Sequence, residues 1–205
     1  MHISEGVLSG PVLLSGAALA AAGTAIGLKK LDYDHIAKAG MLSGAFFIAS
    51  LIHVPLGPTS VHLIMNGIVG LLLGWAAFPA ILVALALQAA FFQFGGITTL
   101  GVNTIIMALP AVVCHHLFAP LLRRSPAVAL TAAFTCGFLA VTMGGIILGL
   151  ALMFTEERFF EVAAAVVAGH LPVMIIEGIV TALCVAFLKK VQPSMLPGYS
   201  PKEVA

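Results

Sequence analysis

The sequence predicts an all-α, polytopic integral membrane protein with about seven transmembrane helices. Of its 205 residues, 61% are hydrophobic and only 8% are charged, whereas about one quarter of the residues in a soluble domain carry a charge. Apolar stretches recur along the chain, and a hydrocarbon layer of about 30 Å is crossed by about 20 helical residues. The net charge of +1 also excludes a basic surface for nucleic acid.

Five apolar stretches are long enough for one crossing each, and two shorter ones lie between the second and the third. The long stretches cover residues 8–28, 37–54, 103–122, 126–153 and 160–188. The short stretches, 61–75 and 78–94, are separated near Trp75 and Pro79. We interpret them as two short helices joined by a tight inner turn, which gives seven crossings. The alternative is one long broken helix, which gives six.

Basic residues favour seven crossings, because short loops rich in Lys and Arg remain in the cytoplasm. With the N-terminus outside, the cytoplasmic side receives Lys29, Lys30, Lys38, Arg123, Arg124, Lys189, Lys190 and Lys202. Arg158 alone falls outside. With six crossings, Arg123 and Lys189 instead fall on the opposite side from Lys29. We therefore expect a multi-pass protein of a prokaryotic cytoplasmic (inner) membrane, with the C-terminus in the cytoplasm.

The chain is expected to form one transmembrane domain over residues 1–190. Its N-terminal segment 1–7 is expected to insert into a site at the outer face, and residues 191–205, with three prolines, to form a loose cytoplasmic tail. The first apolar run lacks the basic residues that precede the apolar core of a signal peptide, so Met1 is expected to be the mature N-terminus. Three separated cysteines are expected to be packing residues: Cys114, Cys136 and Cys184.

Met1 and His2 are the strongest candidates for a metal site. The terminal amine and the amide nitrogen of His2 close a five-membered ring on a metal, and His2 Nδ1 closes a six-membered ring with the same amide. A fourth imidazole completes a square plane, which suits Ni(II) and Cu(II) and can be imposed on Co(II). We select His62, expected in the first turn of a helix capped by Thr59 or Ser60. Either histidine alone is more simply explained as a flexible or interfacial side chain.

Polar residues and glycines expected at the same outer face form the predicted pocket wall. They are Thr59, Ser60, Asn66, Gly95, Gly96 and Asn103. Polar neighbours of this kind orient the imidazoles that bind a metal. The glycines allow irregular backbone to enter a pocket, which a membrane tolerates only where protein or water surrounds it.

Other histidines and one acidic residue are weaker candidates. His53 is a possible accessory ligand, although an interfacial position is simpler. His170 and Glu177 share a helix face, and Pro172 between them is expected to kink that helix. Ionisable groups inside a membrane are costly and commonly functional, so the pair is either a polar path or latch between helices, or a buried structural pair. The remaining histidines are expected near the cytoplasmic face: His35, His115 and His116.

Three separated stretches resemble the CbiM/NikM family, the substrate-specificity components of energy-coupling factor importers for cobalt and nickel. The stretches are Met1-His2-Ile3 followed by Glu5-Gly6, then Pro58-Thr-Ser-Val-His62-Leu, and finally Gln88 to Met107. They occur in the family's order, and the resemblance covers most of residues 1–125. The chain departs from the family at Ile3-Ser4-Glu5, where proline or methionine and then aspartate are common, but the chelate uses only the first two residues.

The resemblance implies that Met1, His2 and His62 bind the metal and that the loop from Gly95 to Asn103 forms part of the pocket wall. It implies Ni(II) or Co(II) as the transported substrate, with no organic cofactor. The implied partners are a transmembrane coupling subunit (CbiQ or NikQ type), ATPase subunits (CbiO or NikO type) and a small accessory membrane protein (CbiN or NikN type). The chain has no Gly-x-x-x-x-Gly-Lys-Ser/Thr loop, so we expect its partners to hydrolyse ATP and the chain itself not to be an enzyme.

Three rival functions differ in the residues they use. A self-sufficient divalent metal channel or proton-coupled carrier would use His170 and Glu177. A zinc-dependent membrane hydrolase is disfavoured because the sequence has no His-Glu-x-x-His motif. A structural subunit would bind no metal.

Overall fold

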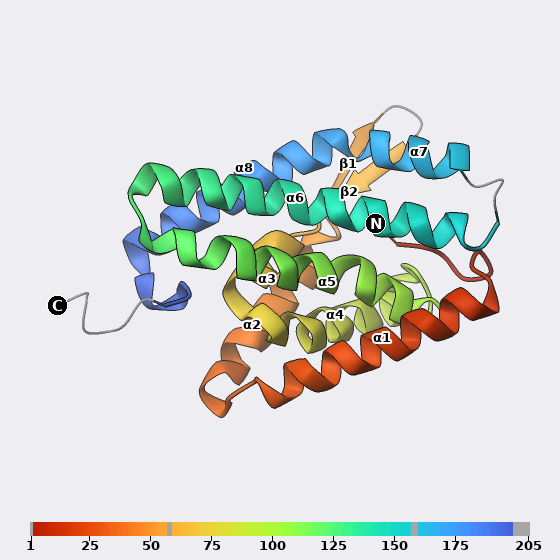
Figure 1. Ribbon diagram of the computed structural model, residues 1–205, viewed down its shortest axis with the longest axis horizontal. Helices are drawn as coiled ribbons and strands as arrows, with labels where there is room; N and C mark the ends of the chain where they lie inside the picture. Colours follow the sequence, from red (N-terminus) through yellow and green to blue (C-terminus); the bar gives the residue numbers. More distant parts are fainter. Residues whose placement is uncertain (1, 57–58, 157–159, 199–205) are drawn as a thin grey trace.

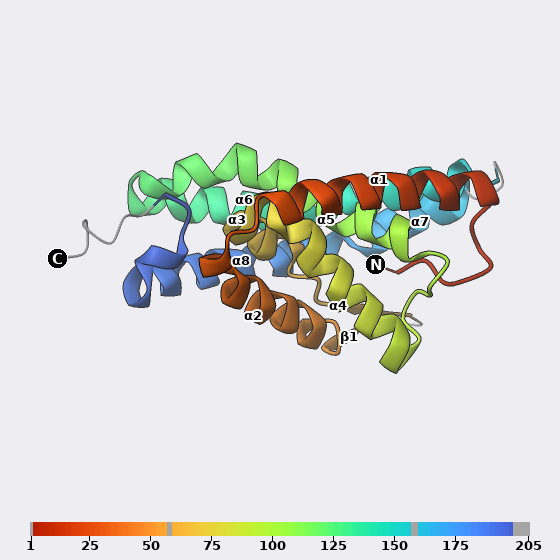
Figure 2. The same cartoon turned by 90° about the horizontal axis from the view of Figure 1, so that it is seen from below.

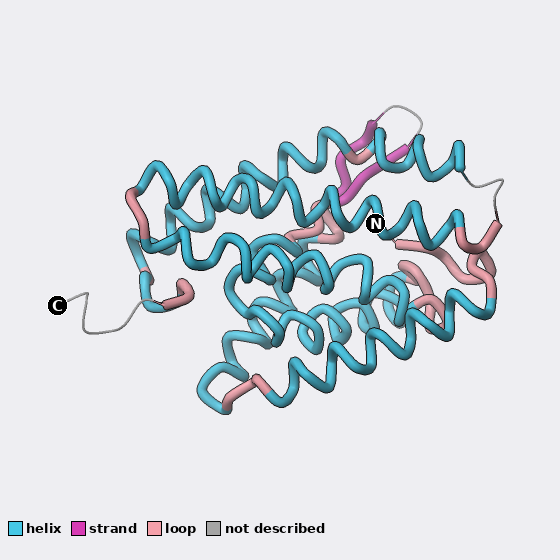
Figure 3. The backbone as a smooth tube through the Cα atoms, viewed as in Figure 1, coloured by secondary structure: helices cyan, strands magenta, loops and turns pink. Residues whose placement is uncertain are grey.

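Helices dominate the computed structural model, which describes residues 2–56, 59–156 and 160–198 (Figure 1). The α-helices are α1 Gly10–Lys29, α2 Tyr33–Ala49, α3 Asn66–Leu73, α4 Ala77–Phe92, α5 Leu100–Phe118, α6 Pro126–Met153, α7 Phe160–Gly169 and α8 Leu171–Val191. Short 3-10 turns are η1 Gly74–Ala76, η2 Ala119–Arg123 and η4 Pro193–Met195. Two short strands, β1 His53–Leu56 and β2 Thr59–His62, form an antiparallel hairpin (Figure 3). The predicted all-α class is confirmed, with this hairpin as an addition.

Within the described residues, five helical segments are long and apolar enough to cross a membrane. They are α1, Asn66–Phe92, Leu100–Arg123, α6 and α8, and α2 contributes a shorter apolar helix over His35–Ala49. The outer helices expose large apolar side chains, as in Leu14 (74% exposed) and Leu183 (64% exposed). Such side chains suit lipid rather than water. The chain is therefore a multi-pass membrane protein, whereas the count of seven crossings stays a prediction.

The chain reverses direction between α3 and α4. Asn66 at the start of α3 bonds the Met107 carbonyl of α5, and Leu71 near its end accepts a hydrogen bond from His115, so α3 runs parallel to α5. Trp75, in the turn after α3, lies beside His116 of α5. Helix α4 then runs back along α5 to the loop that joins α4 to α5. Gly74 has φ +56°, a conformation that few residues other than glycine adopt readily. This reversal supports two short helices rather than one long broken helix.

The hairpin replaces a predicted piece of helix. We expected a helix to 54 and another from 61, but α2 ends at Ala49 and α3 begins at Asn66. The β-branched Thr59 and Val61 favour an extended chain, and Pro55 has no amide donor for a helix. The prediction that Thr59 or Ser60 caps a helix holding His62 is therefore wrong, because these residues lie on β2.

Proline breaks the last predicted span into two helices. The stretch 160–188 was expected to be one kinked helix, and it forms α7 and α8 with His170 between them. Pro172 lies in the first turn of α8, where its missing N–H costs no helical hydrogen bond. Lys189 and Lys190 occupy the last turn, where positive charge is favourable.

The helices α5 and α6 form the centre of the packing. α5 contacts α1, α3, α4 and α6, while α6 packs along α8, and α2 packs on α4. Figure 2 shows α2 and α4 inclined to the long helix α1. Close packing depends on small residues: a Cβ on Gly67 of α3 would lie 2.7 Å from the Gly137 Cα of α6. The segment Asn66–Phe92 is consequently the most buried of the five long segments.

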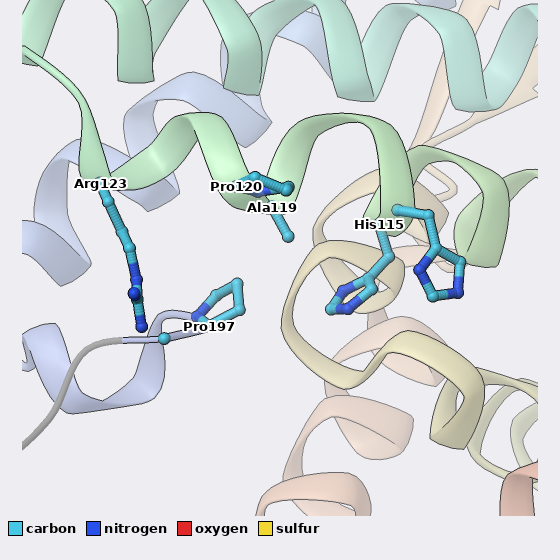
Figure 4. Close-up of a pocket in the computed structure, with 7 residues that line it drawn as sticks. His115, Ala119, Pro120, Arg123 and Pro197 are labelled. Carbon is cyan, nitrogen blue, oxygen red and sulfur yellow. The ribbon is translucent and has the colours of Figure 1, made fainter.

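The start of the predicted tail, up to Gly198, packs against the helices. Leu196 is only 2% exposed, and the Met195 carbonyl accepts a hydrogen bond of 2.7 Å from Lys38 of α2. Gly198 lies against the Arg123 guanidinium. Gly198 and Arg123, together with Pro197 and the end of α5, line a cavity of about 430 Å³ (Figure 4). Residues 199–205 lie outside the described residues.

Candidate metal site

The N-terminal segment is anchored at Ile3 by a side-chain amide. Figure 1 shows this segment turning back from the start of α1 toward the middle of the molecule. The Ile3 N–H donates to Asn103 Oδ1 at 2.9 Å, and Asn103 Nδ2 donates to the Ile3 carbonyl at 3.1 Å. Asn103 is 2% exposed and also donates to Thr99 Oγ1 at 3.2 Å. This pair of hydrogen bonds fixes the backbone directly after His2.

The loop between α4 and α5 approaches the same segment through two glycines. Gly95 has φ +77°, and a Cβ built on it would lie 2.7 Å from Asn103 Nδ2. A Cβ on Gly96 would collide with the side chain of Glu5. The Glu5 carboxylate accepts a hydrogen bond of 3.1 Å from the Thr98 N–H. The predicted pocket-wall residues Gly95, Gly96 and Asn103 thus contact or closely approach the N-terminal segment.

The imidazole of His2 is oriented by Gln88 of α4. His2 Nε2 lies 2.8 Å from Gln88 Oε1, and the Gln88 side chain is fully buried. Because an amide oxygen only accepts, the proton belongs on Nε2 and the lone pair lies on Nδ1. Nδ1 is the atom that closes the six-membered chelate ring. The ring also lies 5.9 Å, centroid to centroid, from that of Phe94.

The imidazole of His62 faces that of His2. The two ring centroids are 4.9 Å apart with an interplanar angle of 34°. His62 lies at the end of β2, and its Nδ1 is 3.0 Å from the Leu63 carbonyl oxygen. The carbonyl only accepts, so Nδ1 carries the proton and the lone pair of His62 lies on Nε2. Residues from two distant parts of the chain thus present a pair of imidazoles to one place.

The donors near this pair fit a chelate built partly from backbone nitrogen. Within the described residues, no group of three or more His, Cys, Asp or Glu side chains could hold a metal, so two imidazoles need additional donors. The amide nitrogen of His2 is one. The terminal amine of Met1 is another, but Met1 lies outside the described residues. Gln88 Nε2 is buried without a hydrogen-bond partner among the residues described.

The other predicted wall residues are placed differently. The Asn66 amide is fully buried and donates to the carbonyls of Met107 at 3.2 Å and Ala140 at 3.4 Å. It therefore joins α3 to α5 and α6. Thr59 and Ser60 lie on β2 beside His62, and the placement of their side chains lies outside what the structure describes.

The predicted path or latch residues lie in different elements. The backbone of His53 pairs directly with that of His62 across the hairpin, although its side chain lies outside the description. His170 separates α7 from α8 and is partly exposed. Glu177 is fully buried in α8, and its carboxylate accepts backbone hydrogen bonds from Ile64 and Met65.

The remaining histidines lie away from His2. His115 is twelve residues beyond Asn103 on α5, about 18 Å along the helix axis. It lines the cavity of Figure 4 with His116, and His35 lines a neighbouring cavity of about 300 Å³. The hydrogen bond of 2.9 Å from His115 Nδ1 to the Leu71 carbonyl joins α5 to α3.

Sequence reasoning missed the role of Gln88. Gln88 interrupts an apolar helix, and a polar side chain in such a helix is costly unless it is paired. That signal was present, but its partner His2 could not be identified without the fold.

The family follows from comparison with known proteins. A family model described as CbiM, cobalt uptake substrate-specific transmembrane region, matches residues 2–195. The chain belongs to the CbiM family. It is 42% identical over 199 residues to a putative metal transport protein of Haemophilus influenzae, covering 96% of this chain and 97% of that one. It is 32% identical over 212 residues to the cobalt transport protein CbiM of Sorangium cellulosum, with 96% and 94% covered.

The fold and two fused relatives extend this finding. A crystal structure of a transition metal transporter superposes with a TM-score of 0.81 at 26% identity, covering 93% of each chain. A fused nickel transport protein NikMN of Rhodobacter capsulatus is 37% identical over 115 residues, 53% of this chain and 33% of that protein. A putative fused cobalt transport protein CbiMQ of Methanocorpusculum labreanum is 27% identical over 215 residues, 95% and 36%. This CbiM-family chain is a component of a metal transport system.

Proposed function

We propose that this chain is the metal-binding membrane component of an energy-coupling factor importer, and that it captures Co(II) or Ni(II) at the outer face. One observation carries the proposal: the His2 and His62 rings approach to 4.9 Å in a member of the CbiM family. The names of relatives described as cobalt or nickel transport proteins support these two ions as the cargo.

The proposed ligands are four nitrogens from three residues. Met1 supplies the terminal amine, His2 its amide and Nδ1, and His62 its imidazole. The two tethered rings and one free-standing imidazole favour a square plane, the geometry of Ni(II) and one that Co(II) can be made to adopt. The amide must lose its proton on binding, so affinity should fall as the pH falls.

Partner subunits would supply the energy. The fused names NikMN and CbiMQ support an accessory subunit of the CbiN or NikN type and a coupling subunit of the CbiQ or NikQ type. We propose that ATPase subunits of the CbiO or NikO type drive release inward. In this arrangement the chain forms one transmembrane domain over residues 1–190 in the cytoplasmic membrane, with residues 191–205 inside the cell.

The rival function, a self-sufficient channel or proton-coupled carrier, receives less support. It requires His170 and Glu177 to line a common path. The Glu177 carboxylate instead accepts hydrogen bonds from two backbone amides of the segment after β2, which is typical of a fixed structural contact.

Extending the N-terminus tests the proposed chelate. Any residue added before Met1 converts the terminal amine into an amide and removes one ligand. Titration of Ni(II) by calorimetry should give one equivalent bound to the native protein and no stoichiometric binding to a form with one added glycine. A tag placed after Ala205 is the matched control and should leave binding unchanged. Equal Ni(II) affinity in the extended and native proteins would reject the chelate.

A further inference from the structure

The carboxylate of Glu177 bonds the backbone just beyond His62. Both Ile64 and Met65 donate their N–H groups to Oε1, and the Met65 donor lies 2.8 Å from Oε1 and 3.0 Å from Oε2. Glu177 is 0% exposed. A buried carboxylate is costly unless hydrogen bonds or charges stabilise it. The two backbone donors at the start of α3 provide hydrogen bonds and a favourable helix end.

The segment that Glu177 bonds has an unusual conformation. Met65 has φ +59° and ψ +13° and immediately precedes α3. Non-glycine residues occupy this left-handed region rarely, because their Cβ crowds the backbone there. Without a hydrogen-bond partner from elsewhere in the fold, Met65 would relax from this left-handed conformation. The Glu177 carboxylate is positioned to maintain the turn. This turn at Met65 sets the direction in which the chain leaves β2.

The opposite side of His62 is fixed by the hairpin. His62 pairs with His53 across the two strands, and the Leu63 N–H donates to the Ile52 carbonyl at 3.2 Å. The hairpin therefore anchors the chain up to Leu63, and Glu177 anchors it from Ile64 onward. His62 precedes the junction of the two anchors.

The backbone that carries Glu177 has little freedom to move. A Cβ on Gly137 of α6 would lie 2.5 Å from both the Glu177 carbonyl oxygen and Thr181 Oγ1. A Cβ on Gly178 would lie 2.8 Å from the ring of Phe134, also on α6. Such close helix contact leaves the carboxylate fixed relative to α6.

We propose that Glu177 is a positioning residue for the metal site, one that fixes the segment after β2 so that the His62 imidazole faces His2. This inference rests on the proposed metal-binding function. Glu177 acts through His62 and does not bind the ion. Glu177 also links α8 to the metal site. A movement of α8 would therefore displace the His62 imidazole.

A double-mutant cycle tests the proposal. Ni(II) affinity and the visible spectrum are measured for the wild-type protein, Glu177→Ala, His62→Ala and the double variant, all with the native N-terminus. Loss of a residue that orients a metal ligand costs about 10–100-fold in affinity, and we expect Glu177→Ala to fall in this range. In the His62→Ala background, the same change should alter the affinity by no more than about twofold, because its route of action is gone.

Two further variants keep the test decisive. Glu177→Gln retains an acceptor oxygen for the backbone donors, so it should recover most of the affinity and the wild-type spectrum, and it replaces Glu177→Ala if the latter does not fold. Thr181→Val removes a buried hydroxyl one turn away that has no hydrogen-bond partner among the described residues, so it should bind Ni(II) like the wild type.

The outcomes separate the two proposals. Equal fold losses with and without His62, or wild-type binding by Glu177→Ala, would overturn the positioning role and leave the metal site intact. Absence of stoichiometric Ni(II) binding by the wild-type protein would instead reject the proposed function on which the inference rests.

Discussion

The hydrogen bonds of two imidazoles decide which of their nitrogens carries the lone pair that the proposed metal site needs. Gln88 accepts from His2 Nε2, and the Leu63 carbonyl accepts from His62 Nδ1. Each bond fixes a tautomer and a ring orientation, the task that outer hydrogen-bond partners perform for metal-binding histidines. The chemistry of the first two residues predicted His2 from sequence, and the family resemblance supported His62. Gln88 could not be assigned a partner, because its contact joins residues 86 positions apart.

Replacing Gln88 by methionine should weaken the site. Methionine has a similar length but no strong acceptor, so His2 loses the bond that places its lone pair on Nδ1. We expect Ni(II) affinity to fall by about 10–100-fold in a calorimetric titration. The control is Ser43→Ala, which removes another buried hydrogen bond, that from Ser43 Oγ to the Ala80 carbonyl. The control should lose stability but keep its Ni(II) affinity, and equal affinities for both variants would contradict the role of Gln88.

At the scale of elements, the prediction succeeded for long apolar helices and failed where the chain is short and irregular. The stretch 126–153 was predicted with the bounds of α6, because one unbroken apolar run leaves few alternatives. The hairpin at His53–His62 was missed, since a four-residue strand gives too little periodicity to distinguish it from a helix end. Irregular backbone was expected from Gly95 to Asn103, whereas α5 already begins at Leu100. The contacts that this loop makes with Glu5 and Asn103 required the fold.

Replacing Gly95 by alanine should damage this loop. The new Cβ has an unfavourable φ of +77° and lies 2.7 Å from Asn103 Nδ2, so the hydrogen bonds to Ile3 would be displaced. Stability should fall by about 1–2 kcal/mol from the backbone alone, measured as a lower Tm in detergent, and Ni(II) affinity should fall with it. Gly44→Ala is the control: no atom lies within 4 Å of its Cβ position in α2, and alanine favours a helix by about 1 kcal/mol. An unchanged Gly95→Ala protein would show that the loop does not support the N-terminal segment.

For the whole molecule, composition was enough to predict a multi-pass helical protein, but not the number of crossings. In the part of the chain that the structure describes, length and hydropathy identify five long segments. The basic residues then favour seven crossings. The reversal at Gly74 agrees with that count, because α3 and α4 run in opposite directions beside α5. The apolar run Asn66–Phe92 does not by itself reveal a reversal. Both α3 and α4 are buried in protein, so the turn between them is as apolar as the helices.

Cysteine labelling distinguishes the two topologies. Seven crossings with the N-terminus outside place Ile97 outside and Gln192 inside, whereas six crossings exchange both. Ile97 is 82% exposed and Gln192 is exposed as well, so a cysteine at either position should react. In a protein without its natural cysteines, an impermeant maleimide added to intact cells should label Ile97→Cys and spare Gln192→Cys. The reverse pattern would contradict seven crossings with the N-terminus outside.

The most direct test of the account is titration of Ni(II) and Co(II) into the purified protein with its native N-terminus, beside His2→Ala and His62→Ala, with visible absorption recorded. We predict one equivalent of metal with the spectrum of a square-planar nitrogen site, lost in His2→Ala and weakened with an altered spectrum in His62→Ala. The relative affinities would rank the two ions. Unchanged binding and spectra in both variants would contradict the proposed site and direct attention to His53, His170 and Glu177.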